Sequence, residues 1–514
     1  MANVFMNGMK NATNYAITEN GALTHKSTMS SLLDLFAMGA AYRTRSDEDV
    51  IMLFKNAYEE DPTYALKCLF YIRDVRGGQG ERRFFRVATK WLASAHTGAM
   101  ERNLIHIPEY GRWDDLFVFI GTPLGAKALD IVKHQLALDI QCKTPSLLAK
   151  WMPSENASSA KTKKMAGIVR RYIGLSSKEY RKVLSALRKR INILERLMSD
   201  GRWDEIEFDK IPSKAGLKYK NAFARHDIER MKTEKNVQSY ADFAKSTETK
   251  VNADTLYPYE VVAKAVEKMG CAYYWCGREK SIDLDDTDRL MINKYWDNLK
   301  DYFDGKSFNG LAVVDTSGSM TGPSADAPIN VAISLGMYCA EKAKGPFAGH
   351  YVSFASRPQL ISVDGVDFCD KVARIYKTNL VDNTNIEATF DMLLNVALKN
   401  KCSQEDLPQN LIIISDMEFD QGTGYYGYRS PAWNPQTLIE QIRDKWAQYG
   451  YHLPHLIYWN CQARQNNIPE NIGCGLVSYV SGMSPSIFET ILSGKTGIEL
   501  MMEVLNKDRY SVIK

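Results

Sequence analysis

The stretch "LAVVDTSGSM", residues 311–320, decides the fold of the C-terminal part of the chain. Its first four residues are all apolar and predict a buried central strand of a parallel sheet. The pattern Asp315-x-Ser317-x-Ser319 follows and falls in the loop at the carboxyl end of that strand, where open α/β sheets bind ligands. One carboxylate and two hydroxyls form an all-oxygen set, which suits a hard cation such as Mg²⁺ and not zinc.

Strand and helix patterns alternate from about residue 308 onward. Further strands are predicted at "HYVSFA", "QLISV", "LIIISD", "HLIYWN" and "GLVSYVSG", and helices at "PINVAISLGMYCAEKA", "IEATFDMLLNVALKN" and "TLIEQIRDKWAQYG". Strands that are separated by crossover helices run parallel. The final "SIFETILSGKTGIELMMEVLN" is expected to supply covering helices. We therefore expect a doubly wound, mostly parallel, Rossmann-like sheet in residues 305–514.

Two more loops offer oxygen atoms at the same end of this sheet. Thr384 in "VDNTNIEAT" lies just before a predicted helix, and Asp416 in "LIIISDMEFD" follows a buried strand. Together with the loop after residue 314, these segments make three loops that present carboxylate and hydroxyl oxygens.

The order of these residues resembles the von Willebrand factor A domain with its metal-ion-dependent adhesion site. That family's pattern is Asp-x-Ser-x-Ser, then a Thr in a loop resembling Gly-Gly-Thr, then an Asp after a later strand. The resemblance implies that a cation, Mg²⁺ or else Mn²⁺ or Ca²⁺, is held by Asp315, Ser317, Ser319, Thr384 and Asp416. It also implies that a carboxylate or phosphate of a partner completes the coordination of the cation.

The sequence departs from that pattern at one place, because Asp382 and Asn383 stand where the family usually has two glycines. A second interpretation of "DTSGS" alone is a strand-to-helix turn in which the serines cap the helix.

Residues 1–304 show helical periodicity and predict an α-helical region of HEAT-like repeats. "SSLLDLFAMGAAYRT", "DEDVIMLFKNAYEED" and "PTYALKCLFYIRDV" follow one another, with Ser46 as an expected N-cap and Pro62 opening the third helix. "GRWDDLF" at 111–117 recurs as "GRWDEIEF" at 201–208, an echo of the kind that irregular helical pairs leave.

The charge of the chain divides at the same place. Residues 301–514 carry 17 Lys and Arg against 23 Asp and Glu, so that 48 of the 65 basic and 38 of the 61 acidic residues fall in residues 1–300. Within the basic half, residues 143–190 hold 13 Lys and Arg and only two acids. This density fits a polyanionic partner, although a solvated helix face is the alternative interpretation.

A basic helical-repeat region followed by one A domain resembles the Ro ribonucleoprotein (TROVE) architecture, in which HEAT-like repeats close into a ring with the A domain. "YIRDVRGGQGER", "IPEYGRWDDLFVF", "AKWMPSENAS" and "HLIYWNCQAR" look closer still to an uncharacterised Ro-related family, common in phages. The resemblance implies binding of small structured or misfolded RNA, or of single-stranded RNA ends. The candidate RNA contacts are Lys161, Lys163, Lys164, Arg170, Arg171, Arg181, Lys182, Arg188, Lys189 and Arg190.

We find no catalytic pattern in the sequence. The Gly-rich "RDVRGGQGERR" at 73–83 lacks the Lys-Ser/Thr ending of a P-loop, so we interpret it as a basic turn between helices. Two alternatives to RNA binding stay open: a protein scaffold whose partner places a carboxylate on the metal, and a metal-dependent nuclease.

The sequence also predicts where the protein works. The composition, with 45% hydrophobic and 25% charged residues, is typical of a soluble globular protein. The length of 514 residues indicates more than one domain. It contains no apolar run of the roughly 20 residues that span a bilayer, and its N-terminus lacks the layout of a signal peptide. We expect a cytoplasmic monomer that does not associate with membranes.

Overall fold

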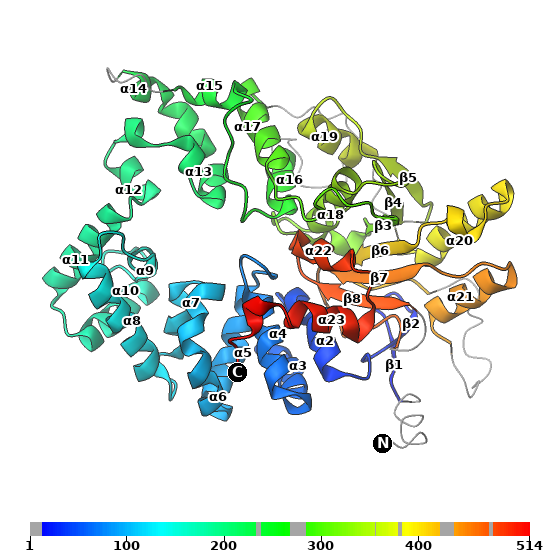
Figure 1. Cartoon of the computed structure of the whole chain (residues 1–514), viewed down its shortest axis with the longest axis horizontal. Coiled ribbons are helices and arrows are strands. Elements are labelled where there is room, and N and C mark those ends of the chain that lie inside the picture. Colours follow the sequence, from blue (N-terminus) through cyan, green and yellow to red (C-terminus); the bar gives the residue numbers. More distant parts are fainter. Residues whose placement is uncertain are drawn as a thin grey trace.

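The structure is a computed structural model that describes residues 13–232, 238–267, 284–354, 356–378, 383–421, 436–471 and 476–514. Helices dominate the N-terminal part, and a six-stranded sheet forms the centre of the C-terminal part (Figure 1). This confirms the expected combination of a helical region with an α/β unit. No helix in these ranges combines the length and the apolar character that crossing a bilayer requires.

The sheet has the strand order β5-β4-β3-β6-β7-β8. All neighbouring strands run parallel except β4 and β5, which no helix separates and which pair antiparallel. The predicted strands and their mostly parallel arrangement are therefore confirmed. The bounds of the strands are β3 (Gly310–Asp315), β4 (His350–Phe354), β5 (Gln359–Ser362), β6 (Asn410–Ser415), β7 (His455–Asn460) and β8 (Val477–Ser481).

The direction in which the chain adds strands reverses at β3. The chain first places β4 and β5 on one side of β3 and then places β6, β7 and β8 on the other side. Such a reversal opens a crevice outside the carboxyl ends of the two central strands, and ligands of open α/β sheets bind there. In this chain the reversal places the carboxyl ends of β3 and β6 side by side at that position.

Helices cover the sheet as the crossover pattern requires. α18 (Pro328–Lys342) packs on β3, β4 and β6, and it approaches β3 closely because a Cβ at Gly336 would lie 2.5 Å from Val314 Cγ2. α20 (Ile386–Asn400) and α21 (Leu438–Gln448) are the two other predicted crossover helices, whereas α19 (Phe368–Thr378) was not predicted. The last segment forms α22 (Phe488–Ile491) and α23 (Gly497–Leu505), which confirms the expected covering helices.

The N-terminal half is a succession of helices of unequal length. Ser46 accepts a hydrogen bond from the Asp49 amide and caps α3, and Pro62 is the first residue of α4, both as predicted. The two "GRWD" segments form short 3₁₀ helices, η3 (Trp113–Phe119) and η4 (Trp203–Glu205). The α-helices are α2 (Ser31–Met38), α3 (Asp47–Glu60), α4 (Pro62–Arg73), α5 (Arg82–Ala95), α6 (Thr97–Asn103), α7 (Ile107–Tyr110), α8 (Gly125–Gln141), α9 (Leu148–Trp151), α10 (Ala160–Ile173), α11 (Ser177–Arg190), α12 (Leu194–Ser199), α13 (Ser213–Arg225), α14 (Asp227–Met231), α15 (Tyr240–Lys245), α16 (Pro258–Glu267) and α17 (Asp286–Asp297).

Both ends of this helical region pack against the α/β unit. At the beginning, α2 contacts β7, β8 and α23, and at the end, α16 contacts α18 while α17 contacts α19. In Figure 1 the helices from α2 to α17 sweep in an arc from one side of the sheet to the other. The helical region is therefore an arc that the α/β unit holds at both ends.

The Gly-rich turn between α4 and α5 fastens this arc to the α/β unit. Gln79 Nε2 donates to the Tyr71 hydroxyl at 2.7 Å, and Gln79 Oε1 accepts from the Ser484 amide at 3.2 Å. A Cβ at Gly78 would lie 2.0 Å from the carbonyl oxygen of Tyr71, so this position requires glycine. The structure confirms the interpretation of the segment as a turn between helices.

An N-terminal hairpin that was not predicted reaches the carboxyl end of the sheet. β1 (Tyr15–Ile17) and β2 (Leu23–His25) pair antiparallel, and the tip between them is closed by the Thr18 amide, which donates to the Ala22 carbonyl. His25 exchanges two main-chain hydrogen bonds with Ile468, at 3.0 and 2.9 Å. The base of the hairpin is thus bonded to the loop that follows β7.

Candidate cation site and basic helical surface

Asp315 and Asp416 lie at the ends of neighbouring strands, at the point where the strand order reverses. β3 and β6 pair parallel with Val314 beside Ile414, so Asp315 lies next to Ser415 and Asp416 follows one residue later. Both carboxylates are buried, with residue exposures of 0% and 2%. Strand pairing thus brings together two acids that are far apart in the sequence.

The two carboxylates differ in how completely they are hydrogen-bonded. Asp315 accepts from the Ser317 amide at 2.9 Å and from the Ser415 hydroxyl at 2.5 Å. Asp416 accepts from the Glu418 amide at 3.2 Å through Oδ1, whereas its buried Oδ2 accepts no hydrogen bond within the described ranges and lies 3.5 Å from Arg464 Nε. A buried carboxylate oxygen without a donor is a position at which a cation can bind.

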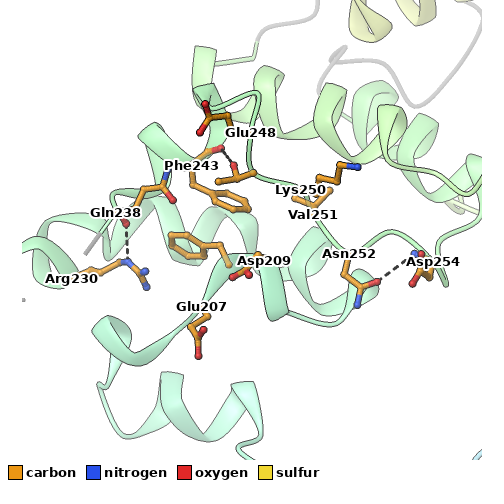
Figure 2. A pocket seen from close by; sticks show the side chains of 12 residues that line it. Glu207, Asp209, Arg230, Gln238, Phe243, Glu248, Lys250, Val251, Asn252 and Asp254 are labelled. Carbon is orange, nitrogen blue, oxygen red and sulfur yellow. Dashed lines mark hydrogen bonds between the residues drawn. The ribbon is translucent and has the colours of Figure 1, made fainter. Parts of the chain in front are cut away.

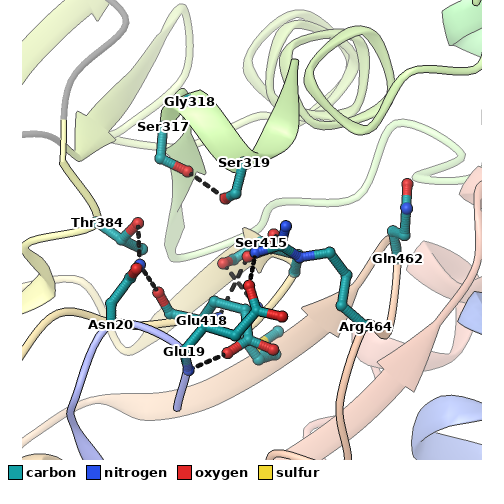
Figure 3. A network of polar contacts seen from close by, with 12 residues as sticks. Glu19, Asn20, Ser317, Gly318, Ser319, Thr384, Ser415, Glu418, Gln462 and Arg464 are labelled. Atoms are coloured by element: carbon teal, nitrogen blue, oxygen red, sulfur yellow. Dashed lines mark hydrogen bonds and ion pairs between the residues drawn. The ribbon is translucent and has the colours of Figure 1, made fainter. Parts of the chain in front are cut away.

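Hydroxyl groups from two loops complete the predicted set. The Ser317 and Ser319 hydroxyl oxygens lie 3.0 Å apart. Thr384 is buried, and its carbonyl accepts from the Asp420 amide at 2.9 Å, which ties its loop to the one after β6. Figure 3 shows these three hydroxyls around the acidic network. The structure therefore gathers all five predicted cation ligands at one end of the sheet.

Burial is the main influence on the carboxyl groups of this site. It raises the pKa of Asp315 to about 7, and the nearby charge of Asp416 adds to that shift. Burial likewise raises the pKa of Asp416, against the effect of a hydrogen bond from Ser319, and it raises the pKa of Glu418 to about 6. Buried carboxylates close together are unfavourable when ionised. A bound cation would remove much of this cost.

The donor atoms fit a hard divalent cation. All of them are oxygens, as Mg²⁺, Mn²⁺ and Ca²⁺ prefer. In the described part of the chain, no three His, Cys, Asp or Glu side chains come together as a metal-binding group. A cation would thus depend on the three hydroxyls as well as on the two acids. Of the two residues that replace the family's glycines, Asn383 is exposed and Asp382 lies outside the described residues.

Four further residues that were not predicted join this network. Glu418 is fully buried, and its Oε2 accepts from the Glu19 amide at 2.8 Å. Asn20 Nδ2 donates to Thr384 Oγ1 at 3.3 Å, and Arg464 contacts the Glu19 carboxylate. Glu418 and Arg464 follow β6 and β7. They could have been predicted, because residues that follow the carboxyl ends of parallel strands meet at one edge of the sheet. The hairpin residues Glu19 and Asn20 carry no such signal.

The ten predicted RNA contacts lie on α10 and α11, but the structure uses three of the arginines internally. Arg188 donates to the carbonyls of Ala149 at 2.8 Å and Met152 at 2.9 Å and to the Ser154 hydroxyl at 2.8 Å. Because these bonds attach α11 to α9 and to the segment after it, Arg188 is a structural residue.

Arg190 and Arg170 are likewise bonded within the helical region. Arg190 donates to the carbonyls of Asp139 at 2.7 Å and Ile140 at 3.0 Å, at the end of α8. Arg170 pairs with Glu155, with Nε and Oε1 2.9 Å apart. These arginines hold neighbouring segments together, which the sequence pattern did not reveal.

The other seven predicted contacts are exposed. Arg181 lies 4.0 Å from Glu155 and is at most weakly paired. Within the described ranges, the remaining six side chains form no ion pair and donate no hydrogen bond; they are Lys161, Lys163, Lys164, Arg171, Lys182 and Lys189. We refer to these six as the basic face.

An open hollow of about 780 Å³ lies elsewhere in the arc, beside α14 and α15 (Figure 2). Phe208, Phe243, Glu248 and Arg230 are among its lining residues. Arg230 donates to the Trp203 carbonyl at 2.8 Å, so its charge serves the fold. None of the predicted cation or RNA residues lines this hollow.

Comparisons with known proteins match nearly the whole chain. A family described as a domain of unknown function (DUF2828) matches residues 18–125 and 146–303, and another described as a domain of unknown function (DUF7788) matches residues 309–511. An uncharacterised protein of Acanthamoeba polyphaga mimivirus is 28% identical over 521 aligned positions, which cover 94% of this chain and 85% of the viral protein. The hairpin tip and the basic face lie in the first match, and the five predicted cation ligands lie in the second.

Proposed function

We propose that this chain, which belongs to the family of the domain of unknown function DUF2828, is an RNA-binding protein. We propose further that it has a divalent-cation site. In this proposal the arc consists of HEAT-like helical pairs and the α/β unit is a von Willebrand A-like domain, as in the Ro (TROVE) architecture that the sequence resembles. The observation that carries the RNA assignment is the basic face, in which six exposed cations on two successive helices have no acidic partner among the described residues.

The chemistry of the basic face supports recognition of a phosphate backbone. Lysines act as point charges on phosphates and release the counterions that condense on nucleic acid. Such contacts position a strand without reading its bases. The proposed ligand is therefore RNA recognised by its shape and charge, either small and structured or misfolded, and not by a defined sequence.

The cation site is the second part of the proposal. Asp315, Asp416 and the hydroxyls of Ser317, Ser319 and Thr384 would hold Mg²⁺, or else Mn²⁺ or Ca²⁺. The bound ion would supply a positive charge for an acidic or phosphate group. Two observations support this assignment: the buried Asp416 Oδ2 accepts no hydrogen bond within the described ranges, and the two buried carboxylates repel each other.

The nucleic-acid content of the purified full chain tests the proposed function. We expect RNA to copurify through a high-salt wash, and we expect a labelled stem-loop RNA to bind with rising fluorescence anisotropy. If the washed protein is free of nucleic acid and leaves the anisotropy of structured and single-stranded RNAs unchanged, the RNA assignment is wrong.

A protein-interaction scaffold is the second candidate, and one observation favours it. The group that contacts Arg464 beside the predicted cation ligands is a carboxylate of a polypeptide, that of Glu19. An acidic side chain of a partner could take the same position. Cation-dependent capture of an acidic peptide by a chain that does not bind RNA would favour this candidate.

A further inference from the structure

Arg464 lies between a carboxylate of the cation site and a carboxylate of the hairpin tip. Its Nε is 3.5 Å from Asp416 Oδ2, and its terminal nitrogen contacts Glu19. The side chains of Arg464 and Glu19 are 32% and 39% exposed, whereas that of Asp416 is only 1% exposed. Solvent therefore reaches the Arg464–Glu19 pair, whereas the Asp416 carboxylate is buried; Figure 3 shows Arg464 and Glu19 in the same polar network as Ser319 and Glu418.

The hairpin tip is held in place without the Glu19 side chain. Thr18 Oγ1 donates to the Phe419 carbonyl at 2.6 Å, and Asn20 Nδ2 donates to the Glu418 carbonyl at 2.6 Å. The Gln421 amide donates to the Asn20 carbonyl at 3.1 Å. Because these bonds anchor the tip on both sides of residue 19, the Glu19 carboxylate can rotate away from Arg464 while the backbone stays in place.

The carboxylates around Arg464 outnumber its single positive charge, so this cluster can accept a cation, and an anion can bind once the cation is present. The carboxylates of Asp416, Glu418 and Glu19 all act electrostatically on one another and on this guanidinium. One arginine does not balance these acids and the adjacent Asp315. With all four carboxylates ionised, a divalent ion at Asp315 and Asp416 would change the net charge of this cluster from about −3 to about −1, and to zero once Glu19 moves away, so an external anion would meet much less repulsion at Arg464.

We propose that Arg464 binds an anion beside the cation site. In the structure the Glu19 carboxylate occupies this anion position, and a phosphate group of RNA would displace it. The inference rests on the proposed RNA-binding function and extends it to a residue outside the five predicted ligands. The planar guanidinium of arginine binds phosphate oxygens in a bidentate manner, as it does carboxylate oxygens. Glu19 would thus be a resident competitor of the ligand.

The experiment compares RNA binding by full-length variants in the presence of MgCl₂, with a labelled uridine oligonucleotide as the probe. Glu19→Ala removes the competitor, so we expect the affinity to rise up to about fivefold, which corresponds to about 1 kcal/mol for a partly exposed ion pair. Glu19→Ala combined with Arg464→Met should lose this gain. Glu205→Ala is the matched control, since Glu205 is an exposed acid that pairs with Arg202 away from the site.

The outcomes separate this inference from the proposed function. An equal gain in Glu205→Ala, or a gain that persists without Arg464, would overturn the role of Arg464. Competition by acetate but not by inorganic phosphate would assign the position to an acidic protein segment and overturn the RNA assignment. If no variant binds RNA, the proposed function fails. In that case, calorimetric binding of inorganic phosphate to Glu19→Ala but not to the double variant would still support the anion site, and no binding would overturn it.

Discussion

Replacement of Asp416 by Asn tests the cation site through protein stability. The variant keeps the size of the side chain but removes one of the two anionic ligands. Without divalent ions, we expect Asp416→Asn to be at least as stable as the wild type, because it relieves the repulsion between two buried carboxylates. With Mg²⁺, only the wild type should become more stable.

The size of this effect follows from mass action. A ligand at 100 times its dissociation constant stabilises the folded state by about 2.7 kcal/mol. An unfolding entropy of about 2.1 cal/mol/K per residue amounts to about 1.1 kcal/mol/K for the 514 residues of this chain. If the chain unfolds as one unit, the melting temperature of the wild type should rise by about 2–3 °C. If the α/β unit unfolds separately, its own transition should shift by more.

Thermal unfolding over a MgCl₂ titration measures this shift. Asp364→Asn serves as the control, because Asp364 is an acid of the α/β unit whose side chain is 69% exposed, so it should respond like the wild type. An equal Mg²⁺-dependent shift in the wild type and in Asp416→Asn would refute the assignment of the site.

Three further predictions concern other parts of the molecule. Gln79→Ala leaves the Tyr71 hydroxyl and the Ser484 amide without their partner, so chemical denaturation should show a loss of about 2–4 kcal/mol in unfolding free energy. Burial lowers the pKa of His455 to about 4, so the unfolded state binds more protons than the folded state between pH 6.5 and 4. The unfolding free energy of the wild type should therefore fall by up to about 3 kcal/mol over that range, relative to that of His455→Gln. Labelled RNA incubated with the protein and Mg²⁺ should stay intact on a denaturing gel, and magnesium-dependent cleavage would instead establish the nuclease alternative.

The parts of the fold that could be predicted carry a local signal. Each central strand is a short apolar run that ends in a polar loop, and the carboxyl ends of parallel strands meet at one edge of the sheet. For this reason Asp315 and Asp416 could be placed together without a structure. The N-cap of α3 at Ser46 was predictable for a similar reason, since capping depends on neighbouring residues only.

The parts that could not be predicted depend on distant contacts. The strands of the N-terminal hairpin have three residues each, and the hairpin is anchored to Ile468 and Phe419, far along the chain. Arg188 and Arg190 appear in the sequence as members of a basic run. Most of their partners are main-chain carbonyls of other segments, which no residue type reveals.

The salt dependence of RNA binding tests the central claim most directly. The variant is Lys161→Ala, Lys163→Ala and Lys164→Ala combined, which removes three members of the basic face and no bond within the described fold. Arg188 and Arg190 stay unchanged, because their loss would disturb the helices themselves. The matched control removes three exposed lysines outside the basic face, Lys300, Lys306 and Lys399.

Affinity for a structured RNA is measured over a range of salt concentrations for the wild type, the variant and the control. Each lost phosphate contact makes the slope of log affinity against log salt shallower by about 0.7–0.9. We therefore expect the variant to bind many RNA sequences more weakly and to have a slope shallower by about two to three units, while the control keeps the slope of the wild type. An unchanged affinity and slope in the variant would contradict the assignment of the basic face as the RNA-binding surface.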